Sequence, residues 1–194
     1  MRKREGNKEQ AILDAAVKVF AEDGYYHAKI SSIADLAGVA TGTIYLYYEN
    51  KEGILLTIFD RLWTELTNGL RIIVKRSDID PAQKLDLVID NFFELFIANP
   101  SIASVFVNEQ HHLINNKRGN VAKHYNDFFD LAEEIIREGV QKKIFSTDVD
   151  ITLFRHFITG GLRNLLGQWA QQSQTLTLDS IRQNVKNFMK HGLM

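Results

Sequence analysis

Apolar residues recur at three- and four-residue intervals along almost the whole chain, and strict alternation of apolar and polar residues is hard to find. This spacing is typical of amphipathic helices, so the pattern predicts an all-α protein. Two prolines in the chain fit the same interpretation, because proline interrupts helices. Helices are expected over residues 11–23, 32–37, 41–48, 51–70, 81–97, 101–115, 119–143, 149–171 and 178–191.

Several of these expected helices are bounded by residues that suit helix ends. Gly24 and Gly38 favour the left-handed conformation that follows many helices, and Gly192 is expected to end the last one. Asp80 followed by Pro81 predicts an N-cap with proline at the first helical position. Further N-caps are expected at Asn50, Asp148 and Thr177.

Composition narrows the class of protein. The chain has 194 residues, a formal net charge of −1 and no cysteine, with 45% hydrophobic and 24% charged residues. This is a globular composition without disulfides or thiolate metal sites, which fits a reducing cytoplasm. The most apolar stretch, residues 92–107, is interrupted by Glu94, Asn99 and Pro100, so no membrane span is expected. Near-neutral charge gives no indication of nucleic-acid binding at this level.

The first fifty residues have the proportions of a helix-turn-helix unit. Three short helices are expected there, with a turn at Gly38 between the second and the third. Ile33 and Ala34 are expected to face inward, while the helix from Thr41 projects outward and presents hydroxyl groups to base edges and phosphates. The alternative is that the helices only pack together, with Tyr45, Tyr47 and Tyr48 as core aromatics.

The stretch ISSIADLAGVATGTIYLYYENKEGIL, from Ile30 to Leu55, resembles the N-terminal domain of TetR-family transcriptional regulators. It follows the pattern IAxxAGVxxGTxYxYFxxKExL and departs from it mainly at Tyr48, where phenylalanine is usual, and at Gly53, where an acidic residue is usual. The resemblance covers about the first 55 residues. It implies an N-terminal DNA-binding domain and a divergent helical ligand-binding domain.

The resemblance also implies roles for individual residues. Lys29 and Ala40 stand where the family often has capping threonine and serine, so Ser31 and Thr41 are expected to cap one residue later. Arg4 belongs to a basic N-terminal segment that either contacts phosphate or the minor groove, or is a solvated terminus. Tyr47 and Lys51 match positions that commonly contact phosphate. The residues expected to face the major groove are Thr41, Gly42, Thr43, Tyr45 and Leu46.

The C-terminal two-thirds is rich in phenylalanine. One hypothesis is a cavity for a small apolar effector, and the alternative is a solid core. The resemblance extends to family members that sense long-chain acyl-CoA, and an acyl chain would suit a cavity lined by phenylalanine. The candidate pocket residues are Phe92, Phe93, Phe96, Phe106, Phe128, Phe129, Phe157 and Trp169.

Glycines within the segment ITGGLRNLLG, in the second-last helix, suggest close packing against a partner subunit. Glycine is unfavourable inside a helix, so a reason for it is expected. Gly160, Asn164 and Gly167 are predicted to lie in a homodimer interface formed by the last two long helices; the alternative is a kinked or loosened helix.

No catalytic or metal-binding arrangement is convincing. Glu109 and His112 have the spacing of a di-iron ligand pair, but the chain has no second copy of that motif. We therefore expect no enzyme activity, no cofactor and no metal. The overall prediction is a cytoplasmic, homodimeric, ligand-responsive regulator that binds double-stranded operator DNA through residues 1–50. Residues 51–194 are expected to bind a small apolar effector that releases the repressor from DNA, with a long-chain acyl-CoA as the candidate. The alternatives are a helical enzyme or small-molecule carrier, and a helical interaction scaffold.

Overall fold

The computed structural model describes residues 2–115, 120–171 and 177–194, apart from the side chains of residues 2–7, 111–112 and 114–115. The described residues contain helices and no strand, which confirms the all-α prediction. The helices are α1 (Arg2–Asp23), α2 (Ile30–Ala37), α3 (Thr41–Ile44), α4 (Lys51–Val74), α5 (Pro81–Ala98), α6 (Pro100–Asn115), α7 (Val121–Gln141), α8 (Ile151–Ala170) and α9 (Leu178–Leu193). None of these helices is long and apolar enough to cross a membrane.

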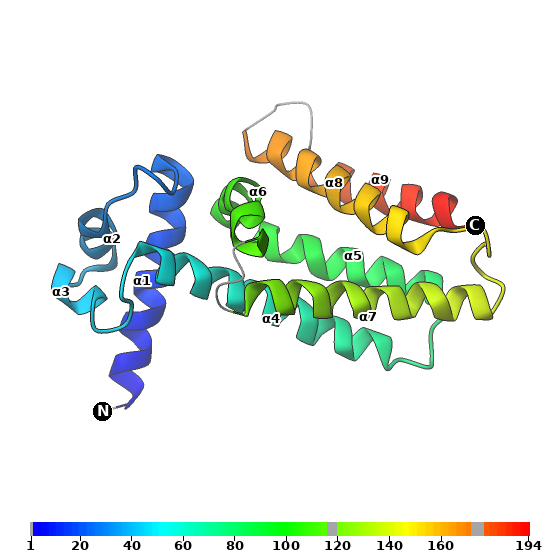
Figure 1. The fold of residues 1–194 in the computed structure, drawn as a ribbon, viewed down its shortest axis with the longest axis horizontal. Coiled ribbons are helices and arrows are strands. Elements are labelled where there is room, and N and C mark those ends of the chain that lie inside the picture. The colour runs from blue at the N-terminus through cyan, green and yellow to red at the C-terminus, as the bar shows by residue number, and fades with distance from the viewer. Residues whose placement is uncertain (1, 116–119, 172–176) are drawn as a thin grey trace.

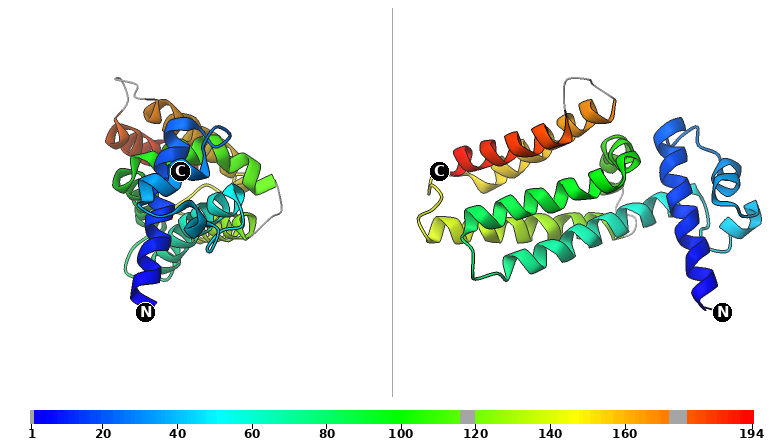
Figure 2. Two further views of the ribbon diagram at one scale, coloured as in Figure 1. Left: turned by 90° about the vertical axis from the view of Figure 1, so that its left-hand side faces the viewer. Right: turned by 180° about the vertical axis from the view of Figure 1, so that it is seen from behind.

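Helices α1 to α3 form a unit at one end of the molecule, and α5 to α9 form a bundle beside it (Figure 1). Helix α4 runs from the first unit into the bundle, where it packs along α7 and α5. Helices α8 and α9 lie side by side on one outer face of the bundle (Figure 2). The only described helix that belongs to both parts is therefore α4.

The turn between α2 and α3 follows from its glycine. Gly38 has φ 67°, a conformation that side chains disfavour, and the N–H of Val39 donates to the Ala34 carbonyl at 3.0 Å. Ile33 and Ile44 are fully buried between the helices. These contacts fix α3 against α2 and leave its other face exposed.

The predicted late caps of α2 and α3 are wrong. Lys29 and Ala40 occupy the N-cap positions without any side-chain cap bond, and Ser31 lies inside α2. Each helix therefore begins where the family pattern places it, and tertiary packing rather than capping holds these ends. Thr41 is the first residue of α3 and is free to face outward.

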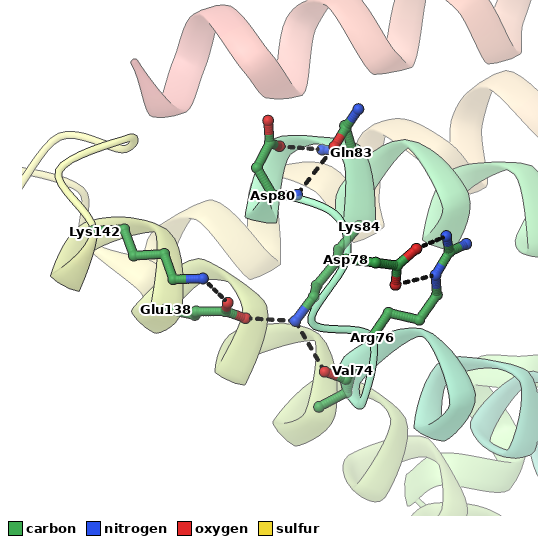
Figure 3. A network of polar contacts seen from close by, with 8 residues as sticks. All are labelled: Val74, Arg76, Asp78, Asp80, Gln83, Lys84, Glu138 and Lys142. Carbon is green, nitrogen blue, oxygen red and sulfur yellow. Dashed lines mark hydrogen bonds and ion pairs between the residues drawn. The ribbon is translucent and has the colours of Figure 1, made fainter.

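Other helix ends agree with the sequence. Asn50 accepts a hydrogen bond from the Gly53 N–H at 2.9 Å, and Thr177 accepts one from the Ser180 N–H at 3.1 Å. Asp80 forms a reciprocal capping box, shown in Figure 3.

Two predicted ends of the C-terminal helices are wrong. Asp150 rather than Asp148 caps α8, and it accepts from the Leu153 N–H at 2.9 Å. The N–H of Asp148 instead donates to the Ser146 hydroxyl, in the turn that precedes the helix. Helix α9 continues through Gly192 to Leu193, which is fully buried and anchors the last turn.

A buried lysine ties the end of α4 to the bundle. Lys84 on α5 is 3% exposed, and its ammonium donates to the Val74 carbonyl at 2.9 Å and to Glu138 at 2.8 Å (Figure 3). Glu138 also accepts from Lys142 at 2.6 Å. The hydrogen bonds from Lys142 and Lys84 lower the pKa of Glu138, so the carboxylate stays charged. This network holds the C-terminal end of α4 against α5 and α7.

Close packing around Gly139 gives a stability prediction. A Cβ at this position would overlap the ring of Phe145, which is 3% exposed. Gly139→Ala is therefore expected to lower the free energy of unfolding by about 1–3 kcal/mol, although alanine favours helices. Gly53→Ala is the control, because a Cβ there meets only ordinary contacts and should leave stability equal or higher. Urea unfolding measures both; equal stability of the two variants would contradict the packing account.

Candidate nucleic-acid interface and ligand cavity

Helix α3 presents the residues that the family pattern places in the major groove. Thr41 and Gly42 are exposed, Tyr45 is 55% exposed and Leu46 is 82% exposed, whereas Thr43 is half-buried. The regular helix is shorter than predicted, because it ends at Ile44 and continues as a turn through residues 45–47. These residues form an outward-facing end of the N-terminal unit, which has the form needed to contact a DNA groove.

Only one of the three neighbouring tyrosines belongs to the core. Tyr48 is 7% exposed, and its hydroxyl donates to Glu9 at 3.4 Å; Glu9 in turn pairs with Arg61 of α4 at 2.5 Å. Burial, and then the nearby Glu9 carboxylate, raise the pKa of Tyr48 to about 12, so the phenol stays protonated and can donate. The departure from the usual phenylalanine thus comes with a polar link between α1, the end of α3 and α4. Tyr47 is half-buried and Tyr45 is outside the core.

Lys51 lies at the start of α4 and holds the loop between α1 and α2. Its ammonium donates to the carbonyls of Tyr26 at 3.0 Å and Ala28 at 2.9 Å, and lies 4.7 Å from the centre of the Tyr25 ring. Two of its three N–H bonds are thereby engaged within the chain. The predicted phosphate contact of Lys51 is thus restricted to what the third N–H can reach. The side chain of Arg4 lies outside the described residues.

Lys51→Met is expected to lower the free energy of unfolding by about 1–2 kcal/mol, because it leaves two carbonyls without their charged donor. Lys29→Met, which removes an exposed lysine at the start of α2, is the matched control and should change stability little. Thermal unfolding measures both variants. The salt dependence of DNA binding adds a separate test: a slope lowered by about one per subunit in Lys51→Met would show that Lys51 is mainly a phosphate contact.

The C-terminal bundle contains a partly open cavity of about 640 Å³. This lies within the range of about 300–1,000 Å³ that is usual for small-molecule sites. Five of the predicted pocket residues lie on its wall: Phe92, Phe93, Phe106, Phe128 and Phe129. These phenylalanines are packed core residues that also border a cavity, and their role in effector binding stays a prediction.

Three of the predicted pocket residues lie elsewhere. Phe96 is fully buried against Phe92 and Phe106, within the aromatic core beside the cavity. Phe157 is 75% exposed, so it faces solvent on the outside of α8. Trp169 is partly buried near the end of α8 but is absent from the cavity wall. These three assignments are wrong because helical spacing identifies apolar positions without showing which neighbour each one meets.

The cavity has an apolar part and a polar part. The walls contributed by α5 and α9 are apolar and include Leu85, Ile89 and Met189. Helices α6, α7 and α8 add polar groups, among them Gln110 and the two arginines Arg155 and Arg163. Sequence reasoning missed these polar residues, because they come from separate helices with no shared motif.

Arg155 lies at the polar side of the cavity and is held over aromatic rings. Its guanidinium is 4.6 Å from the centre of the Phe129 ring and 5.5 Å from that of Tyr125. It also donates to Asn126 at 3.1 Å and lies 3.5 Å from Glu133. The site therefore combines an arginine that is ion-paired with Glu133 and an apolar wall.

Two helices of the cavity wall also contact the N-terminal unit. Trp63 of α4 and both Phe106 and Gln110 of α6 line the cavity. Helix α6 packs against α1, and α4 is joined to α1 through the pair between Arg61 and Glu9. Helices α4 and α6 therefore connect the cavity wall directly with α1.

The outer face of α8 and α9 carries large exposed apolar side chains. Leu153 is 68%, Phe157 75% and Phe188 70% exposed. Gly160 and Asn164 lie on the exposed part of α8, and a Cβ at Gly160 would meet nothing within 4 Å. Within a single chain this surface has no covering layer among the described residues.

Gly167 has a different surrounding from Gly160. A Cβ at this position would lie 3.2 Å from Val107 of α6, so the glycine permits close packing of α8 against α6 inside the chain. Arg163 supports that approach by donating to the Val107 carbonyl at 3.2 Å. This intrachain contact gives Gly167 a packing role of its own, and its predicted place in a dimer interface stays a prediction.

Glu109 and His112, whose spacing alone matches a di-iron ligand pair, fall partly outside the described side chains, since that of His112 is not described. Glu109 is 8% exposed on α6. Among the side chains that the structure describes, no group of histidine, aspartate and glutamate residues is arranged to hold a metal ion.

Two family profiles match the chain. "Bacterial regulatory proteins, tetR family" matches residues 12–58, which include α2, α3 and the start of α4. "Tetracyclin repressor-like, C-terminal domain" matches residues 78–193, from the turn before α5 to the last turn of α9.

Relatives that match over nearly the full length include regulators of fatty acid metabolism. The chain is 30% identical over 191 residues to the fatty acid metabolism regulator protein of Bacillus subtilis, covering 98% of each chain. The fatty acid degradation regulator FadR from Bacillus halodurans has a similar structure, with a TM-score of 0.84, 31% identity and 96% of each chain covered. FadR from Bacillus subtilis in complex with stearoyl-CoA has a TM-score of 0.79 and 28% identity, covering 95% of this chain and 99% of that one.

Proposed function

Because the chain belongs to the TetR family of DNA-binding bacterial transcriptional regulators, we propose that it is a homodimeric repressor that a long-chain acyl-CoA releases from its operator. The observation that carries the proposal is the amphipathic cavity of about 640 Å³ in the C-terminal bundle. Members of this family are regulators rather than enzymes, and the cavity is therefore interpreted as a sensing site.

The cavity suits a molecule with an apolar chain and an anionic head. Leu85, Ile89 and Phe92 offer an apolar surface for an acyl chain. Arg155 and Arg163 on α8 offer cations for phosphate groups at the polar side. Binding of stearoyl-CoA by the FadR structure from Bacillus subtilis supports the same ligand class for this chain.

The exposed face of α8 and α9 is proposed to form the homodimer. Leu153, Phe157 and Phe188 would be covered by the same face of a second subunit in a two-fold arrangement. A dimer is also what operator binding needs, because two recognition elements must reach major-groove half-sites about 34–36 Å apart. The predicted residues Gly160 and Asn164 fall on this face.

We propose that α4 transmits the ligand signal. It begins at Lys51, which holds the α1–α2 loop, and ends at Val74, which Lys84 holds in the bundle. Trp63 lines the cavity between these two attachments. A ligand that shifts α4 and α6 would change the distance between the two recognition elements and favour a state that no longer fits DNA.

The two parts of the chain are proposed to have different functions. Residues 1–50 are proposed to bind the operator and residues 51–194 to bind effector and partner subunit. Thr41, Gly42, Thr43, Tyr45 and Leu46 are proposed to face the major groove, with Tyr47 at the phosphate backbone. Since its target is the chromosome, the protein is proposed to act in the cytoplasm.

The test is a titration of operator complexes with acyl-CoA. Genomic fragments that bind specifically are selected by mobility shift, and affinity should fall steeply with salt. Palmitoyl-CoA is expected to dissociate the complex at micromolar concentration, whereas free CoA and octanoyl-CoA are expected to act much more weakly. An operator complex that palmitoyl-CoA leaves intact would contradict the effector, and the absence of any specific fragment would favour a small-molecule carrier.

A further inference from the structure

Two buried polar atoms in the cavity wall have no hydrogen-bond partner among the described residues: the indole nitrogen of Trp63 and the amide oxygen of Gln110. Buried polar groups in proteins are nearly always paired, so exceptions require an explanation. Trp63 is 1% exposed, which leaves water no access to the indole nitrogen in this state. An unpaired N–H on a residue of the cavity wall, covered by neighbouring rings in this state, points to a partner that arrives with the ligand.

Other buried atoms without a hydrogen bond have simple explanations. Asp60 has a carboxylate oxygen 3.0 Å from His124, and Arg182 has its Nε 3.9 Å from Asp90. Asp86 pairs with Lys190 through its other oxygen at 2.6 Å. Each of these groups has an oppositely charged or titratable neighbour outside the cavity wall. The two atoms on the cavity wall have none of these compensations.

Four aromatic rings that line the cavity lie around Trp63. Its ring centre lies 5.1 Å from that of Tyr125, 5.5 Å from Phe128, 5.9 Å from Phe106 and 6.2 Å from Phe129. These rings offer the indole N–H no oxygen or nitrogen acceptor apart from the Tyr125 hydroxyl, with which no bond is formed. A ligand that shifts one of these rings reaches the nitrogen.

We propose that Trp63 recognises a carbonyl oxygen of the effector, and that this contact is a specificity determinant of the sensing site. An indole nitrogen only donates, so its partner must be an acceptor. In a long-chain acyl-CoA the acceptor at the junction of chain and head is the thioester oxygen. The Gln110 amide lies on the same cavity wall, and an amide rotated to turn its NH₂ toward the same oxygen would be a second donor. The assignment rests on the proposed function, because it specifies which group of that effector the Trp63 indole recognises.

The position of Trp63 gives the contact a regulatory consequence. Trp63 belongs to α4, the helix that runs into the N-terminal unit, and Gln110 belongs to α6, which packs against α1. A carbonyl that is hydrogen-bonded to these residues therefore acts on the positions of both helices that contact the DNA-binding unit. An apolar chain in the cavity without the carbonyl would fill space and lack this directed contact.

The test compares palmitoyl-CoA with its hexadecyl-CoA thioether, which has the same chain and head but no carbonyl oxygen. The full-length protein is expected to bind the thioester about tenfold more tightly than the thioether, the ratio expected for one buried hydrogen bond. Trp63→Phe keeps an aromatic ring and removes the N–H, so its ratio should fall below about twofold. Trp169→Phe, the same change at the other tryptophan of the chain, should keep the tenfold ratio.

The ratio is measured within each variant by calorimetry, so a general loss of affinity or stability in Trp63→Phe cancels. A wild-type protein that binds both ligands equally, or a Trp63→Phe variant that keeps the tenfold ratio, would overturn the assignment while leaving the effector class intact. A protein that binds neither ligand would overturn the effector proposal itself, and the assignment with it.

An independent measurement needs no variant at Trp63. The chain has two tryptophans, so its ¹H–¹⁵N spectrum should contain two indole resonances, which Trp169→Phe assigns. Palmitoyl-CoA is expected to move the Trp63 indole proton downfield, as a new hydrogen bond does, and the thioether is not. An equal shift with both ligands would show that only ring packing changes, and would overturn the assignment.

Discussion

Phe157→Asp is expected to convert the protein into a monomer and to lower operator affinity by a factor on the order of a thousand. Phe157 is 75% exposed in the single chain, on the face of α8 and α9 proposed to meet a second copy. In a two-fold interface the aspartate would be buried twice without a positively charged partner, which strongly disfavours association. Loss of the second recognition element removes the avidity, which is worth about 10²–10⁴ in affinity.

The matched control is Ile72→Asp, because Ile72 is 70% exposed but lies on α4, away from the α8–α9 face. It should remain a dimer and bind operator normally. Sedimentation velocity gives the oligomeric state and mobility shift gives the affinity. A Phe157→Asp protein that stays dimeric would show that the subunits associate through another surface.

Tyr45→Ala is expected to weaken operator binding by about a hundredfold. Tyr45 is 55% exposed at the outward end of the N-terminal unit, and a base contact there is worth about 1–3 kcal/mol in each of two subunits. The fold should not suffer, because the ring lies outside the core. The slope of affinity against salt concentration should stay unchanged, since a base contact releases no counterions.

Leu36→Ala serves as the control for this loss, because Leu36 is 52% exposed on α2 and has no proposed DNA contact. Fluorescence anisotropy with a labelled operator measures both variants at several salt concentrations. If Tyr45→Ala binds like Leu36→Ala, the exposed end of α3 is not the recognition surface. A reduced salt slope would instead assign Tyr45 to phosphate.

The helices and the helix-turn-helix unit were predictable because their determinants are local. Apolar spacing marks α4, Asn50 caps it through a residue three positions away, and Gly38 provides the left-handed turn before α3. Each of these signals depends on neighbours within one or two turns. The same locality explains the errors at the helix ends, where Asp148 and Asp150 have equal capping chemistry and packing decides between them.

The position of a side chain relative to distant helices was not predictable in the same way. Phe92 and Phe157 look alike in the sequence, yet one lines the cavity and the other faces solvent, because helical spacing does not show which face of a helix meets the cavity. Lys51 matched a phosphate-binding pattern, whereas its ammonium is engaged by carbonyls more than twenty positions earlier in the chain. Arg155 and Gln110 reach the same cavity from separate helices, and no spacing rule joins them.

The attachments of α4 and the position of the cavity explain how ligand binding would move the DNA-binding unit. The α1–α2 loop is held by Lys51, the far end of α4 by Lys84, and the cavity lies between the two attachments. When a ligand displaces the middle of a rigid helix that is attached near both ends, the end with the weaker attachment moves more. The buried Lys84 pairs with Glu138 and a carbonyl, so we expect the N-terminal end to move.

The central claim, that effector changes the spacing of the recognition elements, is tested most directly by a distance measurement between subunits. The chain has no cysteine, so Leu36→Cys on exposed α2 gives one spin label in each subunit of the dimer. Pulsed electron–electron double resonance on the operator complex should give one narrow distribution of distances between the two spin labels. This distribution should be consistent with recognition elements about 34–36 Å apart. Saturation with palmitoyl-CoA is expected to move that distribution by several ångströms as DNA dissociates. An unchanged distribution in protein that has bound palmitoyl-CoA and released its operator would contradict the account.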